Sequence, residues 1–491
     1  PSCWTLSLIL PGPERMNAIE GVFDEVQRSS QTHKMCVKKL AAALRPNGQN
    51  EHEHFLACVD EVLKHPGNAS VERTVQFLGA FLSSADESLL DRAMTHICSR
   101  LPSAAKHSRA RVCQIVRSTL DGLCQTNVEL CEKLFNKLQT DLCTRLRDKT
   151  PSVRVAAVRA LKCLQTSEEG DKAVVELTRL LSSDASAAVR AACAETLSLT
   201  DDSKHHLCAR LKDVKAEVRA AVLRRLTEET DCRQFTAQMR AEILRSALED
   251  REAVVRVGVL ALLWRWLAKV DNSNVSKFLN LLNPAENEEA ALLVGATILE
   301  ELMKGDGAHL AKLKKSIKES SIKWRLVSQN ITSLTPADVL WVQVRCSYAR
   351  QFLPVFPASE ICDALLPDAG VLCEVLQALK ASLADPSAYP KASLATKAAH
   401  CCKSLLCLAP LLIGSTDVSG LSQLMECCAD SFLNTSLKLS ADCTDAALRS
   451  YAELHTSMDN GKGDKGEGEL AHHAVLRMTL HLREEVANME V

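Results

Sequence analysis

The sequence predicts an all-α protein of the α-solenoid type, in which antiparallel helix pairs stack into a curved superhelix. Three observations support this fold class. The chain is 46% hydrophobic but only 4% aromatic, with three Tyr in 491 residues, which argues against β-sandwiches and β-barrels. Apolar residues recur at steps of three and four, the spacing of one helix face. A short segment also recurs through the first half at intervals of 29 to 37 residues.

Four segments carry this repeat. Each has an Asp followed six residues later by an Arg that comes directly after a Val, and the spacing leaves room for two short helices and two turns. A fifth, divergent unit begins near Leu282. The four segments are LRDKTPSVRVAAVRAL from Leu146, LSSDASAAVRAACAETL from Leu181, LKDVKAEVRAAVLRRL from Leu211 and LEDREAVVRVGVLALL from Leu248.

The repeated residues have physical roles that can be inferred. We expect the Asp in the turn to cap the second helix of each pair, and Val, Ala and Leu at helical spacing to fill the seam between layers. Because a pair buries only one side of itself, it is stable only beside its neighbours. The result is an extended array with a long concave face.

The Asp and Arg spacing resembles the signature of HEAT repeats. This resemblance implies that the two side chains form a ladder running from repeat to repeat, and it makes a structural role the first interpretation of these arginines. Contact with a ligand is the alternative. The expected ladder residues are Asp148, Arg154, Asp184, Arg190, Asp213, Arg219, Asp250 and Arg256.

The solenoid is predicted to cover residues 16–455, with its clearest repeats at 142–265. Residues 1–15 have no basic region and no cleavage pattern of a signal peptide, so we interpret them as a non-native or disordered extension. Thr335 and Pro336 stand in the order that starts a helix. Residues 456–469 are rich in Gly and charge, which predicts a disordered loop, and 470–491 are predicted to form a C-terminal helix.

The sequence predicts neither an enzyme nor a cofactor, and no metal site. Gly461, Gly463 and Gly466 have the GxGxxG spacing, but no strand precedes them, so we regard the match as accidental. The run from Glu51 to His54 offers possible metal ligands, yet residues two apart lie on different helix faces, which favours a solvated helix start.

The 21 cysteines include no CxxC pair, so buried reduced thiols are the favoured interpretation. Such usage is typical of the cytosol or nucleus. No apolar run is long enough to span a membrane, and we expect a soluble protein without a membrane partner or small-molecule substrate.

Positive charge is concentrated in one part of the chain. The net charge is −2, but residues 101–226 hold 22 Lys and Arg against 15 Asp and Glu, a local net of +7. These cations are either ordinary solvated helix faces or a groove that holds duplex DNA without reading its sequence, since aromatic residues for stacking are scarce there. The candidate DNA-binding residues are Arg109, Arg111, Arg145, Arg147, Lys149, Arg159, Lys162, Lys212, Lys215, Arg224 and Arg225.

Several stretches between Met16 and Leu408 together resemble the CAP-G subunits of condensin, in the same order as in that family. Their order, rather than the general repeat, makes the resemblance specific. The stretches are EVLKHPGNASVERTVQFLGAF near Val62, HSRARVCQIV from His107, LCTRLRDKTPSVRVAAVRALKCLQ from Leu142, RLKDVKAEVRAAVLRRL, SALEDREAVVRVGVLALLWRWL, NLLNPAENEEAALLVGATILEEL and SLTPADVLWVQVRCSYA.

The resemblance implies a non-enzymatic regulatory subunit that binds the kleisin CAP-H, while the SMC ATPase subunits of the complex hydrolyse ATP. It further implies double-stranded DNA held in a basic groove, a role in mitotic chromosome condensation, and a location in the nucleus and on mitotic chromosomes, with cytoplasm in interphase. CAP-G subunits are considerably longer than this chain, which resembles their N-terminal half. A HEAT-repeat adaptor that binds only proteins, such as a transport receptor or a phosphatase scaffold, is the alternative.

Large amphipathic residues in the less regular half are candidates for contact with the kleisin. A few such residues often carry most of the binding energy of an interface. Packing in the core is the other interpretation of each. The candidates are Trp324, Trp341 and Tyr348.

Overall fold

In the computed structural model, the described part of the protein consists of helices, turns and coil. The structure describes residues 18–44, 49–126, 128–166, 168, 170–304, 322–327, 331–353, 355–385, 389, 391–412, 418–433 and 439–460. These ranges contain no strand, which confirms the all-α class. None of their helices is long and apolar enough to cross a membrane.

The chain divides into two compact units. The first contains Pro1–Glu229 and Asp250–Leu262, and the second contains Thr230–Glu249 and Leu263–Val491. Helix α14, Ala253–Leu267, contributes residues to both.

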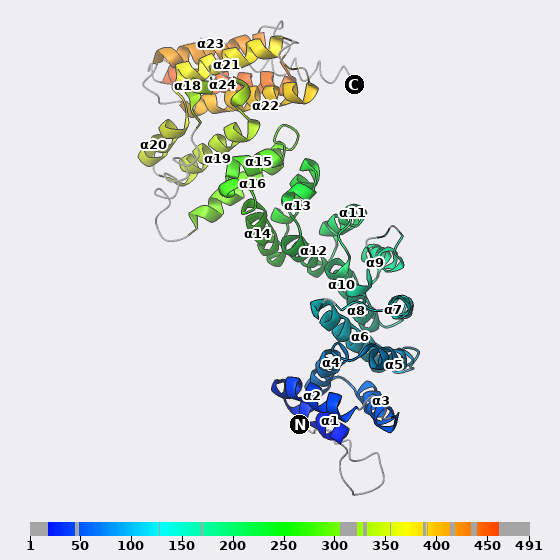
Figure 1. The fold of residues 1–491 in the computed structure, drawn as a ribbon. Helices are drawn as coiled ribbons and strands as arrows, with labels where there is room; N and C mark the ends of the chain where they lie inside the picture. Colours follow the sequence, from blue (N-terminus) through cyan, green and yellow to red (C-terminus); the bar gives the residue numbers. More distant parts are fainter. Residues whose placement is uncertain are drawn as a thin grey trace. The chain divides into compact units, whose positions relative to one another are not determined.

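The first unit is a series of short helices. Their bounds are α1 Ala18–Arg28, η2 Ser30–Thr32, α2 His33–Ala43, α3 Gln49–Lys64, α4 Ala69–Leu82, α5 Glu87–Cys98, α6 Lys106–Thr126, α7 Glu132–Arg145, α8 Pro151–Ala160, η3 Leu161–Leu164, α9 Lys172–Ser183, α10 Ala187–Thr196, α11 Asp201–Ala209, η4 Arg210–Lys212 and α12 Ala216–Glu229. Two rows are visible in Figure 1: α4, α6, α8, α10 and α12 follow one another in one row, and α3, α5, α7, α9 and α11 in the other. Each layer is therefore one helix pair, as the repeats predict.

Helix α8 illustrates why the repeated segment folds in this way. Thr150 is extended, and Pro151 occupies the first helical position, where its missing N–H has no partner to lose. Val153, Ala157 and Val158 are fully buried against the neighbouring layers. Burial of one Val or Leu side chain contributes roughly 1.5–3 kcal/mol. A helix of 10 residues is marginal alone, so the seam between layers stabilises it.

Helices α4 and α6 approach each other closely through two reciprocal pairs of small residues. A Cβ atom on Gly79 would lie 2.0 Å from Ser118 Oγ, and one on Gly122 would lie 2.6 Å from Ser83 Oγ. Glycine is required at both positions because any side chain would separate the two helices.

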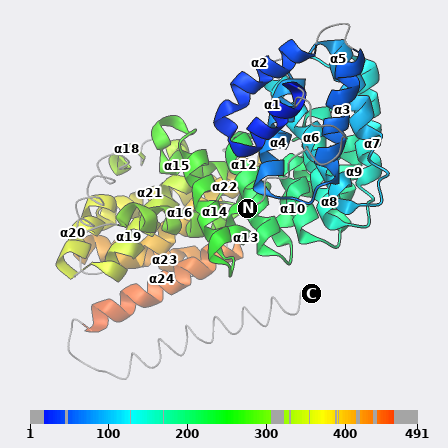
Figure 2. The same cartoon turned by 90° about the horizontal axis from the view of Figure 1, so that it is seen from below.

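The second unit is less regular. Its helices are η5 Cys232–Gln234, α13 Ala237–Leu248, the end of α14, η6 Asp271–Ser273, α15 Val275–Leu281, α16 Glu288–Met303, α18 Trp324–Val327, η7 Ile331–Ser333, α19 Pro336–Phe352, α20 Val355–Leu365, α21 Ala369–Ala384, α22 Ala392–Leu408, η8 Ala409–Leu412, α23 Val418–Leu433 and α24 Ala441–Asn460. Helix α19 begins with the expected Thr335 cap and Pro336. Helices α21 to α24 pack against one another, and α23 lies beside α24 in Figures 1 and 2.

One predicted boundary needs correction. Helix α24 continues to Asn460, so residues 456–460 are helical rather than part of the loop expected at 456–469. A helix whose inner face is already packed can extend past its last apolar residue, which composition alone does not indicate. The expected extension at 1–15, the remainder of the loop and the expected helix at 470–491 lie outside the described residues, as do the glycines of the GxGxxG match.

The close approach of α4 and α6 predicts the effect of a single methyl group. We expect Gly79→Ala to lower the free energy of unfolding by about 1–3 kcal/mol, because the added Cβ must displace Ser118. Gly370→Ala is the matched control, since a Cβ there meets nothing within 4 Å. The control should be neutral or slightly stabilising, as Ala favours helix. Equal urea-unfolding midpoints for the two variants would contradict the close approach.

Candidate nucleic-acid interface

The repeated aspartates and arginines of the first unit lie in a continuous ladder between layers. In each repeat the arginine donates its Nη1 hydrogen to the carbonyl oxygen of the Asp six residues before it, at 2.6–2.8 Å. The hydrogen bonds of Arg256 go to the carbonyl oxygens of Asp250 and Arg251, whereas in the other three of the four repeats the arginine Nε and Nη2 also reach the carboxylate of the following repeat. These bidentate pairs are Arg154 with Asp184, Arg190 with Asp213 and Arg219 with Asp250, at 2.6–2.8 Å.

Each ladder carboxylate also fixes its own turn. Asp148 accepts the N–H of Thr150 at 2.9 Å, and Asp184 accepts that of Ser186 at 2.8 Å. This differs from the expected helix cap, because the accepted N–H belongs to the residue just ahead of the helix. The guanidinium of the neighbouring layer draws the carboxylate away from the first turn, so an Asx turn forms instead.

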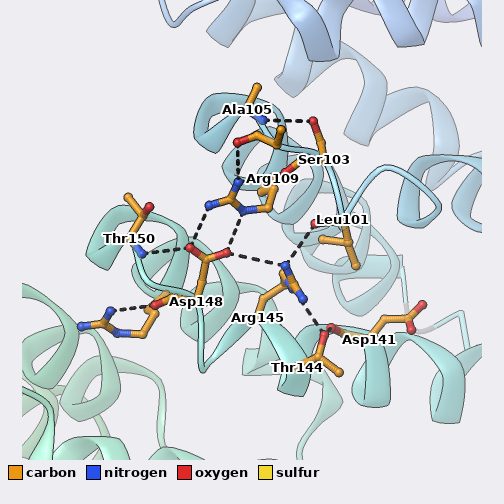
Figure 3. Close-up of polar contacts among 11 residues, drawn as sticks. Leu101, Ser103, Ala105, Arg109, Asp141, Thr144, Arg145, Asp148 and Thr150 are labelled. Carbon is orange, nitrogen blue, oxygen red and sulfur yellow. Dashed lines mark hydrogen bonds and ion pairs between the residues drawn. The ribbon is translucent and has the colours of Figure 1, made fainter.

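The ladder begins one layer earlier than the Asp pattern indicates. Arg109 donates Nε and Nη2 to Asp148 at 2.7 and 2.9 Å, and Nη1 to the carbonyl oxygens of Ser103 and Ala104 (Figure 3). Ser103 occupies the position of the repeated Asp, six residues before Arg109. Arg109 is therefore committed to the ladder and is withdrawn from the DNA candidates. The six-residue spacing from Ser103 to Arg109 matches the repeat and could have revealed this layer. It was missed because Ser103 replaces the repeated Asp.

Hydrogen bonding in the ladder shifts the titration of its carboxylates. The bond from Arg109 holds the pKa of Asp148 below its ordinary value of 3.8, and the bond from Arg219 does the same for Asp250. A lowered folded-state pKa means that these pairs stabilise the fold above pH 3.8 and lose that contribution as the pH falls through the lowered value.

Three other candidate cations are wholly or partly engaged in the fold. Arg225 is buried and donates to the Leu197 carbonyl oxygen at 3.0 Å. Arg145 is half-buried and donates to the Leu101 carbonyl oxygen at 3.2 Å, with Asp148 3.6 Å away (Figure 3). Arg111 is buried between α6 and α4. None of the three presents its charge freely to solvent.

Exposed candidates at the turns form one group, which we call the turn edge. It contains four cations at the turns that join the first helix of a layer to the second: Arg147, Lys149, Lys212 and Lys215. Lys106, at the start of α6, is exposed in the corresponding turn of an earlier layer and is not among the residues singled out from the sequence. Arg147 pairs with Glu176 at 2.9 Å, but at 71% exposure such a pair is weak and readily exchanged.

Arg159, Lys162 and Arg224 form a second group, in the last turn of α8, in η3 and in the second half of α12. Arg159 and Arg224 approach Glu195 of the layer between them at 3.7 and 2.8 Å. Ten residues of α8 correspond to about 15 Å, so this group lies about one helix length from the turn edge. The structure thus separates the sequence candidates into two groups rather than one continuous patch.

The three candidates for the kleisin surface differ in burial. Trp324 is 8% exposed and donates Nε1–H to the Leu365 carbonyl oxygen at 2.9 Å, while Trp341 is 2% exposed beneath the guanidinium of Arg345. Tyr348 is partly exposed, and its ring lies 4.6 Å from that of Phe352, which is 55% exposed. Trp341 also lines a cavity of about 490 Å³ with Asn274, Lys277 and Asp338.

The described residues contain no group of three or more His, Cys, Asp or Glu side chains that could hold a metal ion. His52, one of the possible metal ligands in α3, has its Nδ1 atom 2.9 Å from Nη1 of Arg92. Most described cysteines are buried free thiols, and burial raises the pKa of Cys58 and Cys98 to about 12.

Residues 140–227 match the family of HEAT repeats. The chain is 26% identical over 385 residues to condensin complex subunit 3 of Xenopus laevis, and 25% identical over 378 residues to that of Homo sapiens. Each match covers 70% of this chain and 37% of the relative. The chain thus spans little more than a third of the length of these relatives.

A solved structure has a similar fold. The crystal structure of the Schizosaccharomyces pombe condensin Cnd3–Cnd2 subcomplex aligns with a TM-score of 0.67 and 21% identity, over 90% of this chain and 57% of that one. At this identity the match establishes the fold. The chain is therefore a HEAT-repeat solenoid whose curated relatives are condensin subunits.

The ladder predicts a large effect of removing one carboxylate. Asp148→Ala leaves Arg109 buried without its partner, so we expect the free energy of unfolding to fall by about 3 kcal/mol, more than the roughly 1 kcal/mol of a lost cap. Urea unfolding measures the difference.

Asp202→Ala, at a carboxylate that is 91% exposed, is the matched control and should be nearly neutral. Adding Arg109→Met to Asp148→Ala should recover part of the loss, because no unpaired charge remains. Equal losses in Asp148→Ala and the control would exclude the ladder as a stabilising element.

Proposed function

We propose that this protein is a non-enzymatic regulatory subunit of a condensin complex. It binds the kleisin CAP-H and double-stranded DNA without sequence specificity during mitotic chromosome condensation, while the SMC subunits hydrolyse ATP. It acts in the nucleus and on mitotic chromosomes and resides in the cytoplasm in interphase. The observation that carries this proposal is the 26% identity to one condensin subunit over 385 residues, joined to a shared HEAT-repeat fold.

Binding of the kleisin has support from two sources. The similar solved structure is a subcomplex of two condensin subunits, and the sequence resembles subunits whose partner is a kleisin. In this chain, Trp324 and Trp341 belong to the core, whereas the tilted rings of Tyr348 and Phe352 lie in contact at the surface of α19. Adjacent exposed aromatic rings bury a large apolar area at little entropic cost when a peptide covers them. We assign the kleisin contact to this pair.

DNA binding is supported by the distribution of charge in the first unit, where the ladder pairs are buried and the cations of the turn edge are exposed. Within the described layers the ladder carboxylates form their short bidentate pairs with the ladder's own arginines, so most of their charge is neutralised inside the ladder. Arg145 and Arg210 approach Asp148 and Asp213 only at 3.6 and 3.8 Å. The α7–α8 and α11–α12 turns are two layers apart, about 20 Å at 8–10 Å per layer. That distance corresponds to about six base pairs at 3.4 Å each, so one duplex running along the edge reaches both turns.

A protein-only adaptor remains the alternative, favoured by the pairing of Arg159 and Arg224 with Glu195. Such mutual neutralisation is what a solvated helix face shows. Because this group lies apart from the turn edge, the two can be tested separately.

The aromatic pair Tyr348 and Phe352 predicts a selective loss of kleisin binding. Tyr348→Ala with Phe352→Ala should weaken the affinity for a kleisin peptide by tenfold or more, the effect expected of an interface hot spot of about 2 kcal/mol, without lowering the melting temperature. Trp341→Ala is the comparison, and it should lower the melting temperature first because its ring is buried. Isothermal titration and thermal melting supply the readouts. Unchanged peptide affinity in the double variant would remove this pair from the interface.

Charge removal at the turn edge predicts weaker DNA binding. The quadruple variant Arg147→Gln, Lys149→Gln, Lys212→Gln and Lys215→Gln should lose affinity equally for unrelated duplexes. The slope of log affinity against log salt should fall by about 0.9 for each DNA phosphate that the variant no longer neutralises, since fewer counterions are released. The measurement is duplex affinity at several salt concentrations, with the kleisin present.

A matched control removes the same charge from exposed lysines elsewhere: Lys34, Lys38, Lys277 and Lys391. This control should retain the affinity and slope of the wild type, and both variants should fold, because exposed charges contribute little to stability. The same loss of affinity in both variants would show a general effect of net charge. No loss in either would favour the protein-only adaptor.

A further inference from the structure

Arg111 occupies a position where the regular repeats have almost no side chain. Counted from the repeated Asp, or from Ser103 in its layer, it is the eighth residue. Its guanidinium reaches Gly67 ahead of α4, and the equivalent Gly258 faces Leu223 of α12, so this position meets the preceding layer. The corresponding residues of the regular repeats are Ala156, Ala192, Ala221 and Gly258. A long cation in this seam is therefore an exception that the packing alone does not require.

The guanidinium of Arg111 is buried but poorly satisfied. The residue is 5% exposed, its Nη1 donates to Gln114 Oε1 at 3.1 Å, and its Nε has no hydrogen-bond partner. Burial lowers the pKa of Arg111 below its ordinary value, and the electrostatic attraction of Glu72 only partly opposes this effect. Two residues earlier, Arg109 is equally buried but holds a carboxylate with two hydrogen bonds. Burying an arginine without such a counter-ion is strongly unfavourable.

This guanidinium lies at the N-terminus of α4. Its Nη2 is 3.5 Å from the position that a Cβ would take on Gly67. The next residue, Asn68, caps the helix and accepts the N–H of Val71 at 2.9 Å. The N–H groups of Ala69 and Ser70 have no acceptor among the described residues, and residues 67–69 are exposed. Free amides, the positive end of the helix dipole and a cation thus converge at a point that solvent can reach.

We propose that Arg111 and the N-terminal amides of α4 form a binding site for a phosphate group. A phosphate oxygen accepts hydrogen bonds from helix N-terminal amides, and a guanidinium fork matches two of its oxygens. The anion completes the charge compensation of Arg111, which Glu72 in the first turn of α4 provides only in part and without an ion pair in contact. The regular repeats, with Ala or Gly at this position, have no equivalent site.

Two sources can provide this phosphate: the backbone of a DNA duplex, or free inorganic phosphate. The first rests on the proposed function, and it is consistent with the position of Lys106, exposed at the start of α6, the helix that carries Arg111. The N-terminus of α6 is tied to the α3–α4 turn, since His107 Nε2 lies 2.8 Å from the Lys64 carbonyl oxygen. The second source requires no DNA at all.

The first test compares melting of the full chain in phosphate and in chloride at constant ionic strength. We expect phosphate to raise the melting temperature of the wild type by ~2–4 °C. Arg111→Met should melt no lower than the wild type in chloride, because it removes an unpaired buried charge, and it should not respond to phosphate. Arg117→Met, on the same helix at an arginine that is 48% exposed, should respond as the wild type does.

Ala69→Pro provides an independent variant. Proline is favoured at the first helical position, so the substitution removes one amide donor while preserving α4. It should weaken the response to phosphate without loss of fold. The site is excluded if the wild type shows no phosphate-specific rise, or if both Arg111→Met and Ala69→Pro respond like the wild type.

Duplex affinity at several salt concentrations distinguishes the two sources. If the DNA backbone occupies the site, Arg111→Met lowers the salt slope by about one unit. If the slope is unchanged while the phosphate response disappears, the site takes free phosphate. The turn-edge variant retains Arg111, and Arg111→Met retains the turn edge. DNA affinity of the turn-edge variant therefore tests the proposed function, whereas the phosphate response of Arg111→Met tests this site.

Discussion

In three of the regular repeats, the second helix is held to the next layer by one guanidinium that binds in two directions. Arg190, for example, donates to the carbonyl oxygen of Asp184 in its own turn and to both carboxylate oxygens of Asp213 in the following one. The apolar seam supplies most of the stabilising free energy, but apolar contact is not directional. Because its hydrogen bonds are directional, the ladder fixes the register of one layer on the next.

A consequence of the ladder is a separation of charges. Its carboxylates and guanidinium groups neutralise one another at low exposure, as Arg109 and Asp148 do at 6% and 4% of their side-chain surface. The exposed cations at the turns, such as Lys149 and Lys215, are not part of this mutual neutralisation. A chain with a net charge of −2 can in this way present a positive surface without any excess of Lys and Arg overall.

The sequence was sufficient for the repeats, because the Asp and Arg spacing and the helical period are local features. It was not sufficient to decide which arginines face solvent. Arg225 and Arg224 are neighbours in sequence, yet one is buried against a carbonyl oxygen and the other is exposed. Arg109 was hidden because Ser103 replaces the Asp of its repeat. Trp324 and Tyr348 are both large amphipathic residues, and only tertiary packing separates the buried one from the partly exposed one.

Positions that depart from the repeat indicate where a residue serves a role other than packing of the layers, such as binding. At the eighth position, Ala or Gly lets adjacent second helices approach, and this small residue suffices for packing. Arg111 replaces it with a side chain that carries a charge into the seam and gains a single hydrogen bond to another side chain there. Because Glu72 offsets the burial of this charge only in part, Arg111 lowers the stability of the isolated chain unless an anion from outside completes the compensation. The exposed N-terminus of α4 beside it can hold that compensating anion.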